Sequence, residues 1–127
     1  MTLVLLLASM FFASNNIHAK ELSPDEVKNK SYIYYKNGVT EYNKEHYDEA
    51  LQQLQKSLVY RSSTRTKKLI DEIRKKGKSF YETGIALINF DKEMATQYLQ
   101  KALPLIDPKD KKTIEHIKAL LKPDKQD

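Results

Sequence analysis

An internal repeat constrains the fold of this 127-residue chain more than any other feature of its sequence. The segment Tyr47–Leu58 can be laid over Lys92–Leu103, 45 residues further along, so that the small, the leucine and the Gln-Lys positions coincide. Each copy follows a segment in which aromatic residues precede a glycine, Gly38 or Gly84. A period of this length predicts a stack of equivalent helical units. The matched pairs are Ala50 with Ala95, Leu54 with Leu99 and Leu58 with Leu103.

Apolar residues recur at helical spacings throughout the rest of the chain. Offsets of three and four residues are typical of amphipathic helices, and no stretch shows the sustained alternation of a strand. Three glycines and four prolines are too few for an all-β chain with many tight turns. We therefore predict an all-α fold of five antiparallel helices, over about residues 24–44, 47–60, 64–89, 92–106 and 108–122.

Cap residues set several of the expected helix ends. Ser23 and Glu26 form a capping box with proline at the first helical position between them. Asp107 as N-cap and Pro108 as the first helical residue predict the start of the last helix. Pro104 falls in the last turn of the fourth helix, where we expect it to bend or end that helix.

The repeat resembles the tetratricopeptide repeat, a helix-turn-helix unit of about 34 residues. The resemblance covers about residues 32–108 and is strongest in the first unit. Glu41 departs from it, since an aromatic residue is common there, and the second unit is one residue shorter. The 11 extra residues between the copies equal about three helical turns, which we expect at the start of the third helix. The first-unit positions that match are Tyr34, Gly38, Tyr42, Tyr47, Ala50, Leu54 and Leu58.

The resemblance implies two hairpins and a packing role for the matched residues. Gly38 and Ala50 would be small because the two helices of a hairpin cross there, and Gly84 and Ala95 would repeat that contact. Leu54 and Leu58 would fill the seam to the next hairpin, as Leu99 does in the second unit. The fifth helix would cap the apolar face that two hairpins leave open, through Ile114, Ile117 and Leu121.

The first residues differ from the rest. An apolar run of about 11 residues, Leu3–Ala13, is too short to span a bilayer and precedes a polar stretch ending at Ala19. We interpret residues 1–19 as a signal peptide, 20–122 as the helical domain and 123–127 as a disordered tail. The alternative is an uncleaved membrane anchor. The expected location is the periplasm or cell envelope, and the resemblance is to repeat proteins of the bacterial exported type.

Two candidate binding surfaces follow from the helical spacing. Tyr32, Tyr35, Val39 and Tyr42 share one face of the first helix. Tyrosine is a good interface anchor, so this stripe either lines a partner-binding groove or builds the core. The second candidate, a basic patch, carries eight basic and two acidic residues, hence +6, against +5 for the whole chain. Its basic residues are Arg61, Arg65, Lys67, Lys68, Arg74, Lys75, Lys76 and Lys78.

The residue types favour binding over catalysis. The chain has no cysteine, and its three histidines are scattered, so no metal site or cofactor is predicted. No phosphate-binding loop or nucleophile elbow occurs. We expect a non-enzymatic interaction module, an accessory or scaffold subunit of a cell-envelope assembly of the secretion, pilus or flagellar-motor type. The alternatives are an anionic membrane surface as the partner of the basic patch, or a self-assembling homo-oligomer; nucleic acid is not expected.

Overall fold

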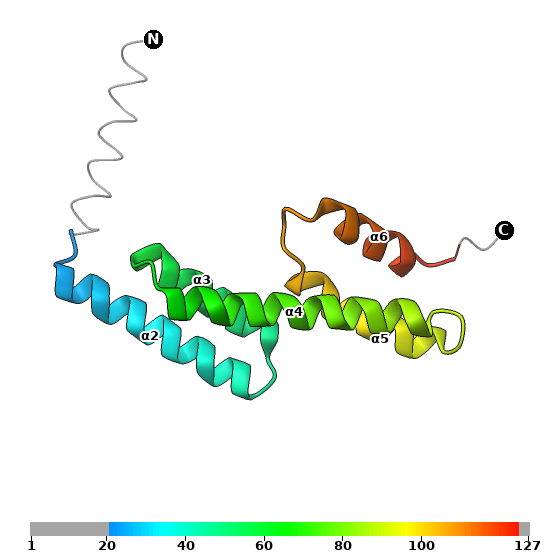
Figure 1. Cartoon of the computed structure of the whole chain (residues 1–127), viewed down its shortest axis with the longest axis horizontal. Coiled ribbons are helices and arrows are strands. Elements are labelled where there is room, and N and C mark those ends of the chain that lie inside the picture. The colour runs from blue at the N-terminus through cyan, green and yellow to red at the C-terminus, as the bar shows by residue number, and fades with distance from the viewer. Residues whose placement is uncertain (1–20, 125–127) are drawn as a thin grey trace, which may run out of the picture.

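The computed structural model describes residues 21–124, which form five α-helices and one 3-10 turn, with no strand in this range. The predicted all-α fold is confirmed. The predicted signal peptide and residues 125–127 of the predicted tail lie outside the described residues. None of the described helices combines the length and hydrophobicity that crossing a bilayer requires. The elements are α2 (Pro24–Asn43), α3 (Tyr47–Tyr60), α4 (Thr64–Leu87), α5 (Lys92–Ala102), η1 (Leu103–Leu105) and α6 (Lys111–Leu121), as Figure 1 shows.

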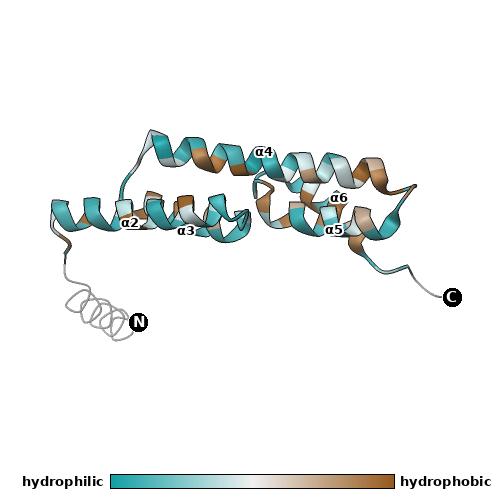
Figure 2. Ribbon diagram, turned by 90° about the horizontal axis from the view of Figure 1, so that it is seen from below, coloured by the Kyte–Doolittle hydropathy of each residue, from teal (hydrophilic) through white to brown (hydrophobic). Residues whose placement is uncertain are grey.

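The helices form two hairpins, and α4 of the second hairpin also packs against the first. Helices α2 and α3 pack together as the first hairpin, and α4 with α5 forms the second. Helix α4 is 24 residues long and also contacts α3, so it runs along both hairpins (Figure 1). Its first turns are largely hydrophilic and its last turns hydrophobic (Figure 2). The predicted lengthening of the third helix is therefore present, and it connects the two units.

Both hairpins close on the same kind of contact. A Cβ atom added to Gly38 would lie 2.7 Å from Cγ of Leu54 and 3.3 Å from a backbone oxygen of the facing helix. At Gly84 the corresponding distances, to Cγ of Leu99 and a backbone oxygen, are 2.8 and 3.3 Å. Both leucines are completely buried. The two glycines therefore lie where the helices of each hairpin approach most closely, and a side chain there would push them apart.

The core consists of two clusters of buried side chains that meet at Phe80, which packs against both. Leu105 of η1 belongs to the first cluster, so the turn after α5 reaches back across α4. In the second cluster Ile117 of α6 is completely buried, and Ile114 and Leu121 pack around it. Leu58, which was expected to fill the seam between the hairpins, is only half-buried and belongs to neither cluster. The first cluster contains Ala50, Leu51, Leu54, Ile73 and Leu105, and the second contains Leu99, Ala102, Ile106 and Ile117.

The largest differences from the predicted helix bounds are at the end of α5 and the start of α6. Helix α5 ends at Ala102, and Pro104 lies in the 3-10 turn that follows. Helix α6 begins after Asp110, whose Oδ1 accepts a hydrogen bond from the backbone N–H of Thr113 at 3.2 Å. The prediction that Asp107 caps this helix is wrong, because Asp107 caps the preceding turn instead, accepting from the N–H two residues on at 3.0 Å.

Candidate functional site

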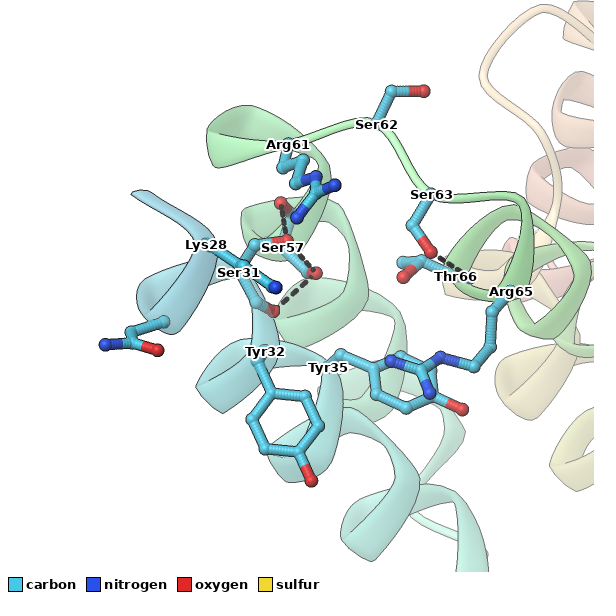
Figure 3. A pocket seen from close by; sticks show the side chains of 11 residues that line it. Lys28, Ser31, Tyr32, Tyr35, Ser57, Arg61, Ser62, Ser63, Arg65 and Thr66 are labelled. Atoms are coloured by element: carbon cyan, nitrogen blue, oxygen red, sulfur yellow. Dashed lines mark hydrogen bonds between the residues drawn. The ribbon is translucent and has the colours of Figure 1, made fainter. Parts of the chain in front are cut away.

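A cleft of about 600 Å³ opens where the beginning of α2, the end of α3 and the beginning of α4 meet (Figure 3). Its lining contains three basic side chains, five serine or threonine hydroxyls, two tyrosines and one asparagine, and no carboxylate. We call it the cationic cleft and define it by Lys28, Tyr32, Arg61, Arg65 and Thr66. The cleft brings together the start of the tyrosine stripe and the start of the basic segment.

A reciprocal pair of serines forms the floor of the cleft. The Ser57 hydroxyl donates to the backbone oxygen of Ser31 at 2.7 Å, and the Ser31 hydroxyl lies 3.1 Å from both the backbone oxygen and the hydroxyl of Ser57. Both side chains are buried. The pair ties α2 to the end of α3 and satisfies the buried hydroxyls. It therefore fixes the floor and leaves ligand contacts to the other residues of the cleft.

The link between α3 and α4 brings the start of α4 to the cleft. Its residues Arg61 and Ser63 have extended backbone conformations, which end α3 and turn the chain. The Ser63 hydroxyl then caps α4 by accepting from the backbone N–H of Thr66 at 3.4 Å. The N-terminus of a helix carries partial positive charge. This end of α4 therefore adds to the positive potential of the cleft.

The three basic side chains of the cleft are not neutralised. None of the ion pairs among the described residues involves Lys28, Arg61 or Arg65. The guanidinium carbon of Arg65 lies 4.2 Å from the centroid of the Tyr35 ring. A guanidinium that stacks on a ring keeps its N–H edges available for hydrogen bonds. Arg65 is thus held in place without using its donors.

The predicted tyrosine stripe divides between the cleft and the core. Tyr32 is 50% exposed at the cleft, and Tyr35 is half-buried beneath Arg65. Tyr42 packs against the first core cluster and meets Tyr47 edge to face, with ring centroids 5.5 Å apart. Val39, between them, is half-buried.

The predicted basic patch does not form one surface. Successive helical residues point in different directions, so a continuous basic run is spread around α4. Arg74 faces inward, where its Nη1 donates to the backbone oxygens of Leu105 and Ile106 at 3.0 and 3.1 Å. Lys75 pairs with Glu72 at 3.2 Å. The remaining members separate into two groups: Arg61 and Arg65 line the cationic cleft, whereas Lys67, Lys68, Lys76 and Lys78 are exposed along α4.

Of the five residues that define the cationic cleft, Lys28 and Thr66 were not among the binding residues predicted from the sequence. Lys28 precedes Tyr32 and Tyr35 by four and seven residues, so the helical spacing that defined the stripe could have included it. Thr66 gave no comparable signal, because its place at the cleft depends on how α4 packs against the first hairpin.

A second groove of about 530 Å³ lies between the hairpins, with Tyr47, Phe80 and Tyr98 along it. Their ring centroids are 6.2 and 6.1 Å apart in succession. Lysines already lie over the outer rings: Lys76 over Tyr47 and Lys101 over Tyr98, at 5.9 and 5.7 Å. Acidic side chains also line this groove, so its charge is mixed. The cationic cleft is the more selective site because its charge has one sign.

The cationic cleft is suited to hold an anionic group against hydroxyls and an aromatic side chain. Its lining contains one lysine and two arginines, and no carboxylate offsets them. Within residues 21–124 no three potential metal ligands gather in one place. Comparisons of the chain with known protein families, with curated proteins and with solved structures found no match.

Proposed function

We propose that this protein is a non-enzymatic binding module that holds another protein, with the cationic cleft as its contact site. The observation that supports the proposal is the meeting of half-exposed Tyr32 with three unpaired basic side chains in one cleft. Tyrosine and arginine are the residue types that most often carry binding energy at interfaces. The paired hairpins also favour membership of the tetratricopeptide-like repeats, whose surfaces serve as binding platforms.

The proposed setting follows from the first residues of the sequence. A signal peptide over residues 1–19 would carry the helical domain out of the cytoplasm. There the domain would act as an accessory or scaffold subunit of a cell-envelope assembly. N-terminal sequencing of the protein from the native cell tests the export step, and a mature chain beginning at Lys20 is expected.

Site-specific photocrosslinking tests the binding role. A photoreactive phenylalanine analogue at Tyr32 should give a discrete adduct with one protein in cells. The same analogue at Phe90, which is 87% exposed in the turn before α5, serves as the control and should not. Arg61→Gln with Arg65→Gln should abolish the Tyr32 adduct while the helical content is retained. Equal adducts from both positions, or an adduct that survives the double change, would contradict the proposal.

A further inference from the structure

The Thr66 hydroxyl lies at the deep end of the cationic cleft without a protein partner. The residue is only 1% exposed, yet its hydroxyl forms no hydrogen bond with a described residue; the bond to Ser63 comes from the Thr66 backbone N–H. Among the described residues no fully enclosed side-chain oxygen or nitrogen lacks a partner. The hydroxyl must therefore retain contact with the cleft, and Figure 3 shows it pointing there from α4. A buried hydroxyl in this position is available to a ligand oxygen.

The three basic side chains that line the same cleft come from three segments of the chain. Lys28 comes from α2, Arg61 from the link and Arg65 from the first turn of α4. In Figure 3 Lys28 and Arg61 lie near the serine floor, and Arg65 lies across from them over Tyr35. The donors therefore approach the centre of the cleft from different directions. A ligand that uses them all needs several acceptor oxygens around one centre.

Charge and shape together select the class of ligand. A carboxylate brings one charge and two oxygens in a plane. A phosphate monoester brings about −1.5 to −2 charges at pH 7 and three strong acceptor oxygens. Arginine binds such groups through two parallel hydrogen bonds, and lysine binds them as a point charge. Three unpaired basic side chains and a free hydroxyl fit the phosphate better.

We propose that the cationic cleft binds a phosphate monoester carried by a segment of the partner protein. The part of this proposal that names a partner protein as the carrier rests on the proposed function. The phosphate site itself is inferred from the residues of the cleft alone. The phosphate oxygens accept from the Thr66 hydroxyl and from the three basic side chains, and Tyr32 at the rim contacts the carrier.

The test is a titration of the chain followed by amide resonances in NMR. The probes are a phosphoserine peptide, the same peptide with serine, the same peptide with glutamate, and inorganic phosphate. The phosphoserine peptide should shift the amides of residues 61–66 and bind at least tenfold more tightly than the serine and glutamate peptides. Its affinity should rise severalfold between pH 5 and pH 7.5, because the second phosphate ionisation lies near pH 6. The glutamate peptide should show no such rise.

Matched variants locate the binding. Arg65→Gln and Lys28→Gln should each weaken the phosphoserine peptide about tenfold. Thr66→Val keeps the shape of the side chain and loses the hydroxyl, so it should weaken binding about threefold. Thr66→Ser keeps the hydroxyl and should bind as tightly as the unchanged chain. Lys118→Gln removes the same charge from the exposed face of α6 and should leave the affinity unchanged. Far-ultraviolet circular dichroism checks that each variant is folded.

Several results would overturn the inference. Equal affinity for the phosphoserine and glutamate peptides would show that the cleft does not select a phosphate group. Equal affinity for the phosphoserine peptide and inorganic phosphate would show that the protein segment contributes nothing to binding. If the chain binds vesicles containing phosphatidic acid and none of the peptides, the carrier of the phosphate is a membrane lipid and not a protein. If the phosphoserine peptide fails but the Tyr32 adduct still depends on Arg61 and Arg65, only this inference is wrong. If the adduct is absent as well, the proposed function fails with it.

Discussion

The two hairpins share one crossing geometry and differ at their open ends. At the spacing that relates Gly38 to Gly84, Ser31 of the first hairpin corresponds to Gly77 of the second. Ser31 forms part of the floor of the cationic cleft, and no described helix or turn covers this end of the first hairpin. A Cβ on Gly77, in contrast, would lie 2.6 Å from Cβ of Leu105 and 3.1 Å from its backbone carbon. The second hairpin is closed because η1 packs directly on the glycine.

The same comparison separates two basic residues. Arg74 corresponds to Lys28, and its guanidinium holds the backbone of η1 through two carbonyl oxygens. Lys28 has no ion pair and lines the cationic cleft. One basic position thus has a structural partner in the closed hairpin and none in the open one. The repeat therefore supplies the scaffold, and the segment that follows each hairpin decides whether its end is open or closed.

The first prediction concerns the contact between a glycine and a buried leucine that both hairpins contain. Leu54→Ala and Leu99→Ala each remove a completely buried side chain packed on a glycine. Each should lower the free energy of unfolding by about 3 kcal/mol, from lost burial plus the cavity left behind. Urea unfolding followed by circular dichroism measures both. Similar losses of stability would show that the two hairpins are equivalent at these contacts, whereas a large loss in only one variant would show that they are not.

The second prediction concerns the matched basic residues. Arg74→Gln removes two charged hydrogen bonds to the backbone of η1 and should cost about 2 kcal/mol of stability. Lys28→Gln should change stability by less than about 0.5 kcal/mol, as for a surface residue without partners. The same urea experiment applies. Comparable losses in the two variants would mean that Lys28 has a structural role and that the open end is less free than proposed.

The third prediction concerns the floor of the open hairpin. Ser31→Ala and Ser57→Ala should each cost about 1 kcal/mol, because each breaks one side of a buried reciprocal pair and leaves the other hydrogen bond in place. The double variant should lose less than the sum, because the contact between the two hydroxyls, 3.1 Å apart, is already lost in each single variant. Strict additivity in unfolding experiments would show that the hydroxyls contribute independently.

Local signals in the sequence predicted most of the fold. The bounds of α3 agree with the prediction, because an apolar stripe and the turn residues after Tyr60 are both local. The long α4 followed from the spacing of the repeats. The cleft could not be predicted in full, because it depends on three segments that only tertiary packing brings together. The inward position of Arg74 depends in the same way on η1, which lies far along the chain.

The start of α6 shows a different limit. Asp107 and Asp110 both precede apolar residues at helical spacing, and either could serve as the cap. The structure uses both: the Asp107 backbone oxygen closes a turn by accepting from the Asp110 N–H at 2.9 Å, and Asp110 then caps the helix. The turn follows directly on buried Ile106, so packing rather than cap preference selects the second aspartate.

The fourth prediction concerns the helix N-caps that follow each hairpin. Ser63 caps α4 with a neutral hydroxyl, and Asp110 caps α6 with a carboxylate. Hydrogen bonds from Thr113, helped by the nearby charges of Lys78 and Lys112, hold the pKa of Asp110 below its usual value. A carboxyl group whose pKa is lower in the folded state contributes stability above its unfolded pKa of about 3.9. That contribution is lost as the pH falls through the folded pKa.

The two caps should therefore respond differently to acid. Asp110→Asn keeps an acceptor oxygen but removes the charge, so it should lower stability slightly at pH 7, and the difference from the unchanged chain should shrink as the pH falls below about 4. Ser63→Ala should lower the stability by the same amount at pH 7 and below about pH 4, since serine does not titrate in this range. Thermal unfolding at the two pH values measures both variants. A deficit of Asp110→Asn that persists undiminished in acid would mean that the charge contributes nothing, and that the two hairpins end in equivalent caps despite their different residues.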